Sequence, residues 1–266
     1  MEFVKLNNGI AMPILGYGVF QITPGESEHC VRDAITAGYR LIDTAQAYRN
    51  EGGVGAAVKG SGLPRDAFFI TTKVWNSNAG YERAKVSIDE SLRKLQTCYI
   101  DLLLIHQPVG DYLGTYQAME EYYRAGKLRA IGVSNFKPGI FCKFAEQVDI
   151  KPMVNQVETH VFWQQRELRG VMAQYGTKLM AWAPLAEGRN YYFTNRTLAS
   201  IGKRYEKTAA QVALRFLIQN GIIVIPKTVR RERMEENINV FDFHLTDEEM
   251  QAISALDRNE TLFYWI

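Results

Sequence analysis

Short apolar runs alternate with amphipathic stretches along most of this chain. The runs are nearly continuous in hydrophobic residues, which is typical of strands that are covered on both faces in a parallel sheet. Eight runs are predicted to be strands: residues 15–18, 40–43, 68–73, 100–106, 130–134, 153–157, 179–182 and 222–226.

The stretches between the runs carry apolar residues at helical spacing. They predict helices over residues 27–37, 52–59, 81–95, 116–124, 139–147, 164–175, 208–219 and 229–239. One further helix is predicted over residues 247–256, where Thr246 and Glu249 have the spacing of a capping box. Ahead of the first strand, Asn8-Gly9 lies between alternating residues and predicts a β-hairpin.

Eight strands that are each followed by a helix require parallel pairing and right-handed crossovers. The expected fold is therefore α/β, a (β/α)8 TIM barrel with an N-terminal hairpin and an extra C-terminal helix, formed as one domain by residues 1–266. The alternative is an open doubly wound sheet, which usually carries a GxGxxG turn after its first strand. Here Gly16-Tyr17-Gly18 is followed by Val19-Phe20-Gln21, so the barrel is favoured.

Composition and charge mainly exclude other classes. A net charge of +2 gives no general attraction to nucleic acid or to a membrane surface. The three cysteines have no CxxC spacing, which favours reduced packing residues over a disulfide or zinc site. No apolar run is long enough to cross a bilayer, and the first residues do not resemble a signal peptide. We therefore expect a cytoplasmic protein with a small-molecule substrate, and nothing in the chain specifies a protein partner.

Polar or reactive side chains stand at the ends of the predicted strands. They are Asp43, Lys73, His106, Ser134, Asn135, Gln156, Trp182 and Lys227. The C-terminal ends of barrel strands meet at one mouth, where the active sites of such enzymes lie. We therefore expect these side chains to surround one cleft.

Lys73 ends an apolar run, and a lysine so close to the core needs a partner. Asp43, at the end of a neighbouring strand, is the natural one, although the pair taken alone could be purely structural. Tyr48 lies five residues after Asp43 and favours a catalytic interpretation. A nearby ammonium lowers the pKa of a tyrosine, so Tyr48 is predicted to be a tuned proton donor rather than a packing residue.

His106 ends the longest apolar strand. It could be a satisfied structural histidine, but beside Tyr48 it could polarise a carbonyl oxygen. The other histidines, His29, His160 and His244, lack the spacing of metal ligands, so no metal site is predicted.

Several ordered motifs resemble those of the aldo-keto reductases, most closely the branch of prostaglandin F synthase and diketogluconate reductase. The resemblance runs nearly end to end. It is carried by residues 38–45 with Tyr48, and by residues 70–75, 99–106, 131–136, 181–185, 225–228, 236–237 and 240–243.

The resemblance implies a reductase that uses NADPH to convert aldehydes or ketones to alcohols, with keto-sugars and aromatic aldehydes among the candidate substrates. Tyr48 would donate the proton, Lys73 and Asp43 would tune it, and His106 would orient the carbonyl. Trp182 would stack on the nicotinamide. The implied cofactor-binding residues are Ser134, Asn135, Gln156, Trp182, Pro184, Leu185, Lys227, Thr228, Arg233, Glu236 and Asn237.

A local charge pattern supports NADPH over NADH. A helix is expected to begin near Thr228, and Arg230, Arg231 and Arg233 fall in its first turns. Positive charge there opposes the helix dipole unless an anion binds at the same end. The 2′-phosphate of NADPH is such an anion, and we expect Lys227, Thr228 and Arg233 to bind it.

The chain departs from the family pattern at two positions near the substrate. Gln107 stands where an aromatic residue often follows the histidine, and Arg49 replaces the usual glycine after the tyrosine. The expected substrate pocket comprises Phe20, Trp75, Gln107 and Trp182, a wall at residues 190–193, and Tyr264 and Trp265 as possible lids.

Two other kinds of function are compatible with a barrel of this pattern. A non-catalytic barrel could bind NADPH as a sensor, and an isomerase or hydrolase could use the same fold, although no carboxylate pair or metal cluster supports the latter. Two Tyr-x-x-x-Lys pairs, Tyr81 with Lys85 and Tyr123 with Lys127, are typical of short-chain dehydrogenases. Both lie on amphipathic stretches and are predicted to face solvent.

Overall fold

The computed structural model describes residues 1–263 of the chain. The predicted hairpin is present as the antiparallel strands β1 (Phe3–Lys5) and β2 (Ala11–Pro13). Gly9 turns the chain with a φ of +91°, which a residue without a Cβ adopts at little cost. Asn7 and Asn8 donate to the carbonyls of Pro152 and Arg129, so the hairpin lies at the end of the barrel where the later strands begin.

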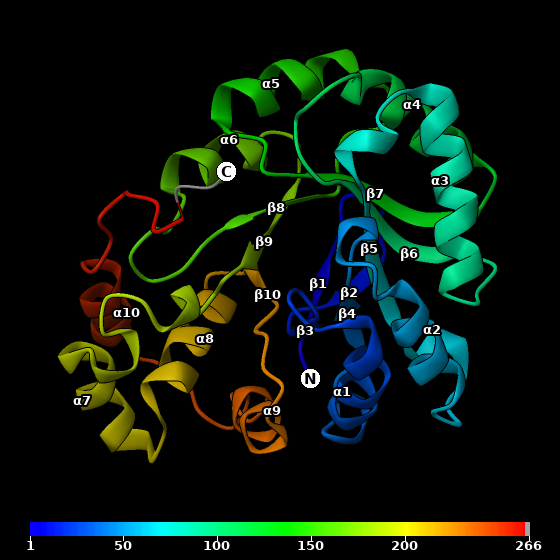
Figure 1. The fold of residues 1–266 in the computed structure, drawn as a ribbon. Helices are drawn as coiled ribbons and strands as arrows, with labels where there is room; N and C mark the ends of the chain where they lie inside the picture. Colours follow the sequence, from blue (N-terminus) through cyan, green and yellow to red (C-terminus); the bar gives the residue numbers. More distant parts are fainter. Residues whose placement is uncertain (264–266) are drawn as a thin grey trace.

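The remaining strands form one parallel sheet of eight, in chain order (Figure 1). They are β3 (Gly16–Gly18), β4 (Leu41–Asp43), β5 (Phe69–Val74), β6 (Ile100–Ile105), β7 (Leu128–Ser134), β8 (Val154–Glu158), β9 (Lys178–Trp182) and β10 (Ile223–Val224). A parallel bridge between Leu15 and Val224 joins the first strand to the last and closes the sheet. The predicted barrel is therefore confirmed.

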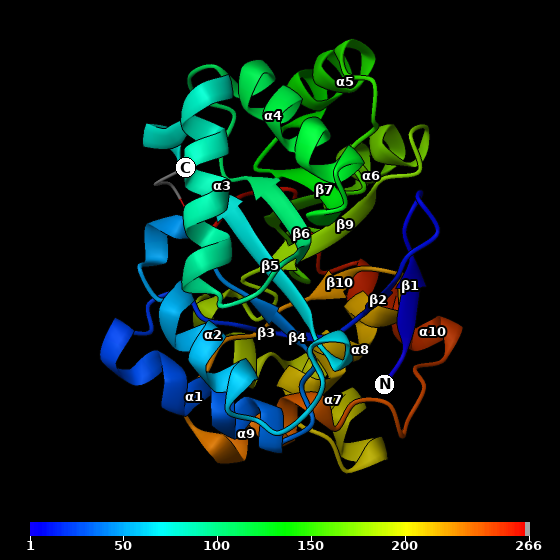
Figure 2. The same cartoon turned by 90° about the vertical axis from the view of Figure 1, so that its right-hand side faces the viewer.

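Helices surround the sheet, as the two perpendicular views show (Figures 1 and 2). They are α1 (Pro24–Thr36), α2 (Glu51–Lys59), α3 (Tyr81–Lys94), α4 (Tyr112–Arg124), α5 (Pro138–Gln147), α6 (Arg166–Ala173), α8 (Ala209–Gln219) and α9 (Arg231–Ile238). The extra helix α10 (Asp247–Ser254) begins at the predicted capping box of Thr246 and Glu249. Helices cover the outer face of the strands and side chains fill the inside, which explains why most strand residues are buried.

One helix was not predicted. α7 (Arg196–Tyr205) lies between β9 and α8, and the side chain of its N-cap residue Asn195 accepts from the Leu198 amide at 3.2 Å. Leu198, Ile201 and Tyr205 lie at helical spacing and form its apolar stripe, so the sequence carries a signal for this helix that the prediction missed. Within residues 1–263, no helix is both long enough and apolar enough to cross a membrane.

Candidate active site

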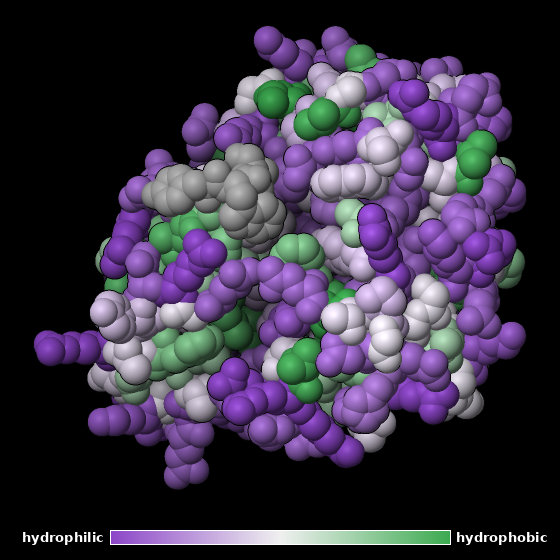
Figure 3. All heavy atoms as spheres, viewed as in Figure 1, coloured by the Kyte–Doolittle hydropathy of each residue, from purple (hydrophilic) through white to green (hydrophobic). Residues whose placement is uncertain are grey.

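A cleft of about 920 Å³ opens at the C-terminal ends of the barrel strands. The space-filling view shows a hollow in this face with apolar side chains inside it (Figure 3). The predicted residues that line the cleft are Phe20, Asp43, Tyr48, Trp75, His106, Gln107, Ser134, Asn135, Gln156, Trp182, Pro184, Leu185, Lys227, Thr228, Arg233, Glu236 and Asn237. Lys73 lies beneath the lining and is completely buried. The structure thus brings the predicted catalytic and cofactor-binding residues together with Phe20, Trp75 and Gln107 of the predicted substrate pocket.

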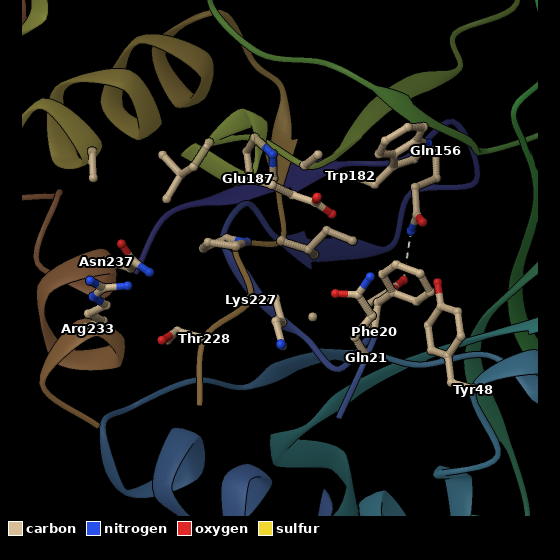
Figure 4. A pocket seen from close by; sticks show the side chains of 18 of the residues that line it. Phe20, Gln21, Tyr48, Gln156, Trp182, Glu187, Lys227, Thr228, Arg233 and Asn237 are labelled. Atoms are coloured by element: carbon tan, nitrogen blue, oxygen red, sulfur yellow. Dashed lines mark hydrogen bonds between the residues drawn. The ribbon is translucent and has the colours of Figure 1, made fainter. Parts of the chain in front are cut away.

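Two ends of the cleft differ in their chemistry (Figure 4). We call the group Asp43, Tyr48, Lys73 and His106 the inner end, and the group Lys227, Thr228 and Arg233 the outer end. In the close-up, Tyr48 and Gln156 lie on one side of the cleft, Arg233 lies on the other, and Lys227 lies between them.

The inner end is built around the ammonium group of Lys73, which is carried by β5. Its Nζ lies 2.6 Å from Oδ1 of Asp43 and donates to the Thr44 carbonyl at 2.8 Å and to the Tyr48 hydroxyl at 3.4 Å. The Gln156 amide donates to the other oxygen of Asp43 at 2.7 Å, the dashed contact in Figure 4. Burial opposes the charge of Lys73, but attraction to Asp43 and Tyr48 outweighs it and raises the pKa of Lys73. The ammonium form therefore persists at neutral pH.

Tyr48 has a pKa above its ordinary value, which differs from the prediction of a lowered one. Burial of the phenol raises this pKa, and the Lys73 ammonium opposes that effect without cancelling it. The prediction included the Lys73 ammonium, which lowers the pKa of Tyr48, but it omitted the desolvation of the phenol, which raises that pKa more strongly. A raised pKa keeps Tyr48 protonated at neutral pH, and a protonated phenol is able to donate.

His106 lies at the end of β6, between the rings of Tyr48 and Trp75. Its ring centroid is 5.7 Å from that of Tyr48 and 5.0 Å from that of Trp75. Burial, aided by the charge of Lys73, lowers the pKa of His106 to about 3. The imidazole is therefore neutral at physiological pH and can offer one N–H as a hydrogen-bond donor. Within residues 1–263, no cluster of acidic, histidine and cysteine side chains is arranged to hold a metal ion.

Asn135 connects the ends of β6, β7 and β9. It follows β7 with a φ of +64°, a left-handed conformation that asparagine tolerates better than most residues. Its amide donates to the His106 carbonyl at 3.1 Å, and its Oδ1 accepts from the Trp182 indole at 2.8 Å. The Ser134 hydroxyl donates to the Gln156 carbonyl at 2.8 Å. These contacts hold the indole of Trp182 in a defined orientation at the cleft wall.

The outer end differs from the prediction in its helix. α9 begins at Arg231, not near Thr228, and its N-cap residue Arg230 makes no side-chain capping contact. The Thr228 hydroxyl instead accepts from the Arg230 amide at 3.1 Å, a local turn that moves the N-cap two residues along the chain, from Thr228 to Arg230. Arg231 pairs with Glu235 on the surface. Among residues 1–263, no acidic side chain forms an ion pair with Lys227 or Arg233.

Glu236 and Asn237 also lie at the outer end, on the face of α9 that lines the cleft. Glu236 accepts from the Thr208 hydroxyl at 2.6 Å, so it ties α9 to the start of α8. Thr208 also caps α8 through a capping box with Gln211. The position of Glu236 is thus fixed from a neighbouring helix.

The predicted substrate pocket is largely aromatic. The rings of Phe20 and Tyr48 are 5.1 Å apart, and Gln107 contributes a polar group near the same end. Phe193 lines the cleft, whereas Tyr191 is 87% exposed, so only part of the expected wall at residues 190–193 faces inward. The suggested lids, Tyr264 and Trp265, lie outside the described residues.

Some lining residues were not predicted. Gln21 and Glu187 reach the cleft from the loops after β3 and β9 (Figure 4). Residues 208–210 reach it from the start of α8. Glu187 has a φ of +50° in an irregular loop that shows no periodic pattern, so no local signal marks it. The Tyr81–Lys85 pair does not line the cleft; it lies on α3, where both side chains contact Glu121 of α4.

Comparison with known proteins agrees with this geometry. The model of the aldo/keto reductase family matches residues 14–258. The chain is 46% identical to the glyoxal reductase of Bacillus subtilis over 261 residues, which cover 97% of this chain and 94% of that protein. It superimposes with a TM-score of 0.95 on an aldo-keto reductase from a Medee basin deep-sea metagenome, at 43% identity and with 98% and 97% of the two chains covered.

A third similarity is to the Bombyx mori aldo-keto reductase, which was solved in complex with NADP. The TM-score is 0.92 at 32% identity, with 99% of this chain and 95% of that chain covered. The chain therefore belongs to the aldo/keto reductase family, whose members are oxidoreductases that reduce carbonyl groups.

Proposed function

We propose that this protein is an NADPH-dependent reductase of aldehydes or ketones in which Tyr48 is the general acid. The single observation that carries the proposal is the buried chain of contacts from Asp43 through Lys73 to the Tyr48 hydroxyl at the floor of the cleft. If the Asp43–Lys73 ion pair were only structural, it would not require the protonated phenol of Tyr48 beside it at the lining of an open cavity.

Each inner-end residue has a defined role in the proposed mechanism. The Tyr48 O–H bond breaks and its proton moves to the carbonyl oxygen of the substrate. The phenolate that forms lies beside the Lys73 ammonium, which stabilises it, and Asp43 keeps that ammonium charged and in place. His106, neutral at working pH, donates a hydrogen bond that orients the carbonyl. NADPH, when bound, supplies the hydride for the carbonyl carbon.

The residues of the outer end fit the charged part of NADPH. Lys227 and Arg233 reach the cleft without an acidic partner in the described part of the chain, so their charge is available to a phosphate. Trp182 would present a fixed aromatic face to the nicotinamide, and Asn135, whose Oδ1 accepts from the indole, fixes that face. The relative solved with NADP supports this choice of cofactor.

The test is NADPH oxidation, followed at 340 nm, with a panel of carbonyl compounds. Because a relative is a glyoxal reductase, the panel begins with glyoxal, and an aromatic aldehyde, a simple ketone and a keto-sugar follow. We expect reduction of at least one class, and loss of it in the Tyr48→Phe variant. Tight NADPH binding without reduction of any compound would contradict the proposal and identify a cofactor-binding protein without catalysis.

A further inference from the structure

A second group of buried polar side chains lies at the end of β8, outside the lining of the cleft. It consists of Glu158, the last residue of the strand, and His160, both almost completely shielded from solvent. Nε2 of His160 lies 2.9 Å from Oε1 of Glu158. A buried carboxylate requires such partners, and the histidine is only one of those that Glu158 has.

The other partners come from the far end of the chain. The Thr261 hydroxyl donates to Oε2 of Glu158 at 2.6 Å, and the Leu262 amide donates to Oε1 at 2.9 Å. We call residues 261–263 the tail segment. After α10 it runs back across the molecule toward β8 and α6, as the end of the chain in Figure 1 shows. A side chain of the barrel thus holds a segment more than a hundred residues away in sequence.

The tail segment in turn contacts the cleft wall. Phe263 is 1% exposed, and its ring packs edge-on against Trp182 with centroids 5.3 Å apart. Arg189, from the loop after β9, holds the segment from the other side. Its guanidinium lies 4.3 Å from the Phe263 centroid and donates to the Leu262 carbonyl at 2.6 Å. Trp182 is therefore fixed by Asn135 through its indole N–H and by Phe263 through its ring.

Apolar packing alone could bury the tail segment, but it would not define the register of the segment. Hydrogen bonds that a carboxylate accepts from one hydroxyl and one backbone amide admit a single register, because a shift by one residue removes both donors and leaves buried Glu158 with His160 alone. This register is the one that brings Phe263, rather than Leu262, against the indole. The polar contacts at β8 therefore determine what supports Trp182.

We propose that Glu158 is a positioning residue of the reductase: by anchoring the tail segment, it sets Phe263 against Trp182 and so fixes the aromatic face of the nicotinamide site. The inference rests on the proposed function, since it assigns Trp182 the role of stacking on the nicotinamide. Glu158 itself does not line the cleft.

The anchor is tested first without any ligand, by amide hydrogen exchange. Glu158→Gln keeps the size of the side chain and removes its charge, and Thr261→Val removes one donor to it. We expect faster exchange at Leu262 and Phe263 in both variants. Glu167→Gln, a similar change at an exposed position at the start of α6, is the matched control and should leave that exchange unchanged. Unchanged protection of the tail segment in Glu158→Gln would overturn the proposal.

The effect on the site is tested by a double-mutant cycle on the rate of hydride transfer, measured in single turnovers with NADPH already bound. Glu158→Gln and Phe263→Ala should each slow this step by about threefold to tenfold, and the double variant should be no slower than Phe263→Ala. Retention of both the melting temperature and the NADPH dissociation constant would exclude a general loss of structure. Additive losses would overturn the proposal, because Glu158 would then act independently of Phe263.

The two experiments also separate this inference from the proposed function. If the wild-type protein reduces no carbonyl, the proposed function fails, and the role of Glu158 in hydride transfer fails with it, whatever the exchange data show. If the wild type reduces carbonyls but the cycle is additive, only the positioning role is lost.

Discussion

The two ends of the cleft hold their positive charges in opposite ways. At the inner end, Lys73 is completely buried and lies 2.6 Å from the carboxylate of Asp43. At the outer end, Lys227 and Arg233 reach the cleft with no acidic partner within residues 1–263. A charge that is paired and shielded from solvent is preorganised, so it can stabilise a new charge on a neighbouring group without rearrangement of the side chains around it. A solvated, unpaired charge is available instead to a ligand that carries its own.

This contrast separates catalysis from affinity. Changes at the inner end should alter turnover and stability, because they disturb buried groups that depend on one another. Changes at the outer end should alter cofactor binding alone, because water can replace a lost contact there. The experiments that follow test this division, beginning with the largest expected effect.

Removal of the Tyr48 hydroxyl should give the largest change. Tyr48→Phe keeps the ring against Phe20 but removes the proton, so turnover should fall by about 10²–10⁴-fold, the usual contribution of a general acid. The NADPH dissociation constant should hardly move. Tyr81→Phe, a surface tyrosine with its own lysine four residues later, is the control and should keep full turnover. Near-normal turnover in Tyr48→Phe would remove the inner end from catalysis.

Loss of one partner of the buried ion pair should affect stability as well as rate. Lys73→Met leaves the Asp43 carboxylate buried without a cation, which should cost about 3–5 kcal/mol in the free energy of unfolding. Asp43→Asn should slow reduction less than Lys73→Met, since the lysine charge survives. The double variant should be more stable than the sum of the two losses predicts. Denaturant titration measures each term, with Lys85→Met on the surface as the control.

Arg233→Ala tests the outer end. A charge-assisted contact to the 2′-phosphate should make NADPH bind about tenfold or more weakly in the variant, while NADH, which lacks that phosphate, should be unaffected. Arg231→Ala is the matched control, since Arg231 is paired with Glu235. Fluorescence titration at one salt concentration gives all the constants. An equal loss for both cofactors would show that Arg233 contacts a part that they share.

His106 should make stability depend on pH. Its pKa is about 3 in the folded protein against an ordinary value of 6.5. Between these two pH values the histidine binds a proton in the unfolded chain but not in the folded protein. The stability contributed by neutral His106 is therefore complete above pH 6.5 and is lost as pH falls toward 3, by up to about 1.4 kcal/mol per pH unit. The free energy of unfolding should fall less steeply in His106→Gln than in the wild type. Parallel curves would contradict the lowered pKa.

The smallest expected effect lies beside Tyr48. Arg49 has a φ of +58° and a ψ of +20°, a left-handed conformation that disfavours a side chain. Arg49→Gly should therefore stabilise the protein, by about 0.5–1 kcal/mol once the added freedom of the unfolded glycine is subtracted. Arg49→Ala keeps the Cβ and should bring no such gain. A loss of stability in Arg49→Gly would show that the arginine side chain makes a favourable contact of its own.

The features that could be predicted are those that the local pattern of apolar and polar residues determines. Continuous apolar runs of strand length between amphipathic stretches specify eight β/α units, and chirality then leaves few ways to close them. The same pattern places Asp43, Lys73 and His106 at strand ends, so their convergence in one cleft follows from the fold. Their chemistry could be anticipated because a lysine that ends an apolar run has to find a partner.

Tertiary contacts decided the features that no local pattern records. The pKa of Tyr48 is raised because the packed barrel removes water from the phenol, a term that spacing along the chain does not contain. The start of α9 at Arg231 depends on the local turn at Thr228. The pairing of Glu158 with Thr261 and Leu262 joins positions far apart in sequence, and it exists only because the closed barrel brings the end of the chain back to β8.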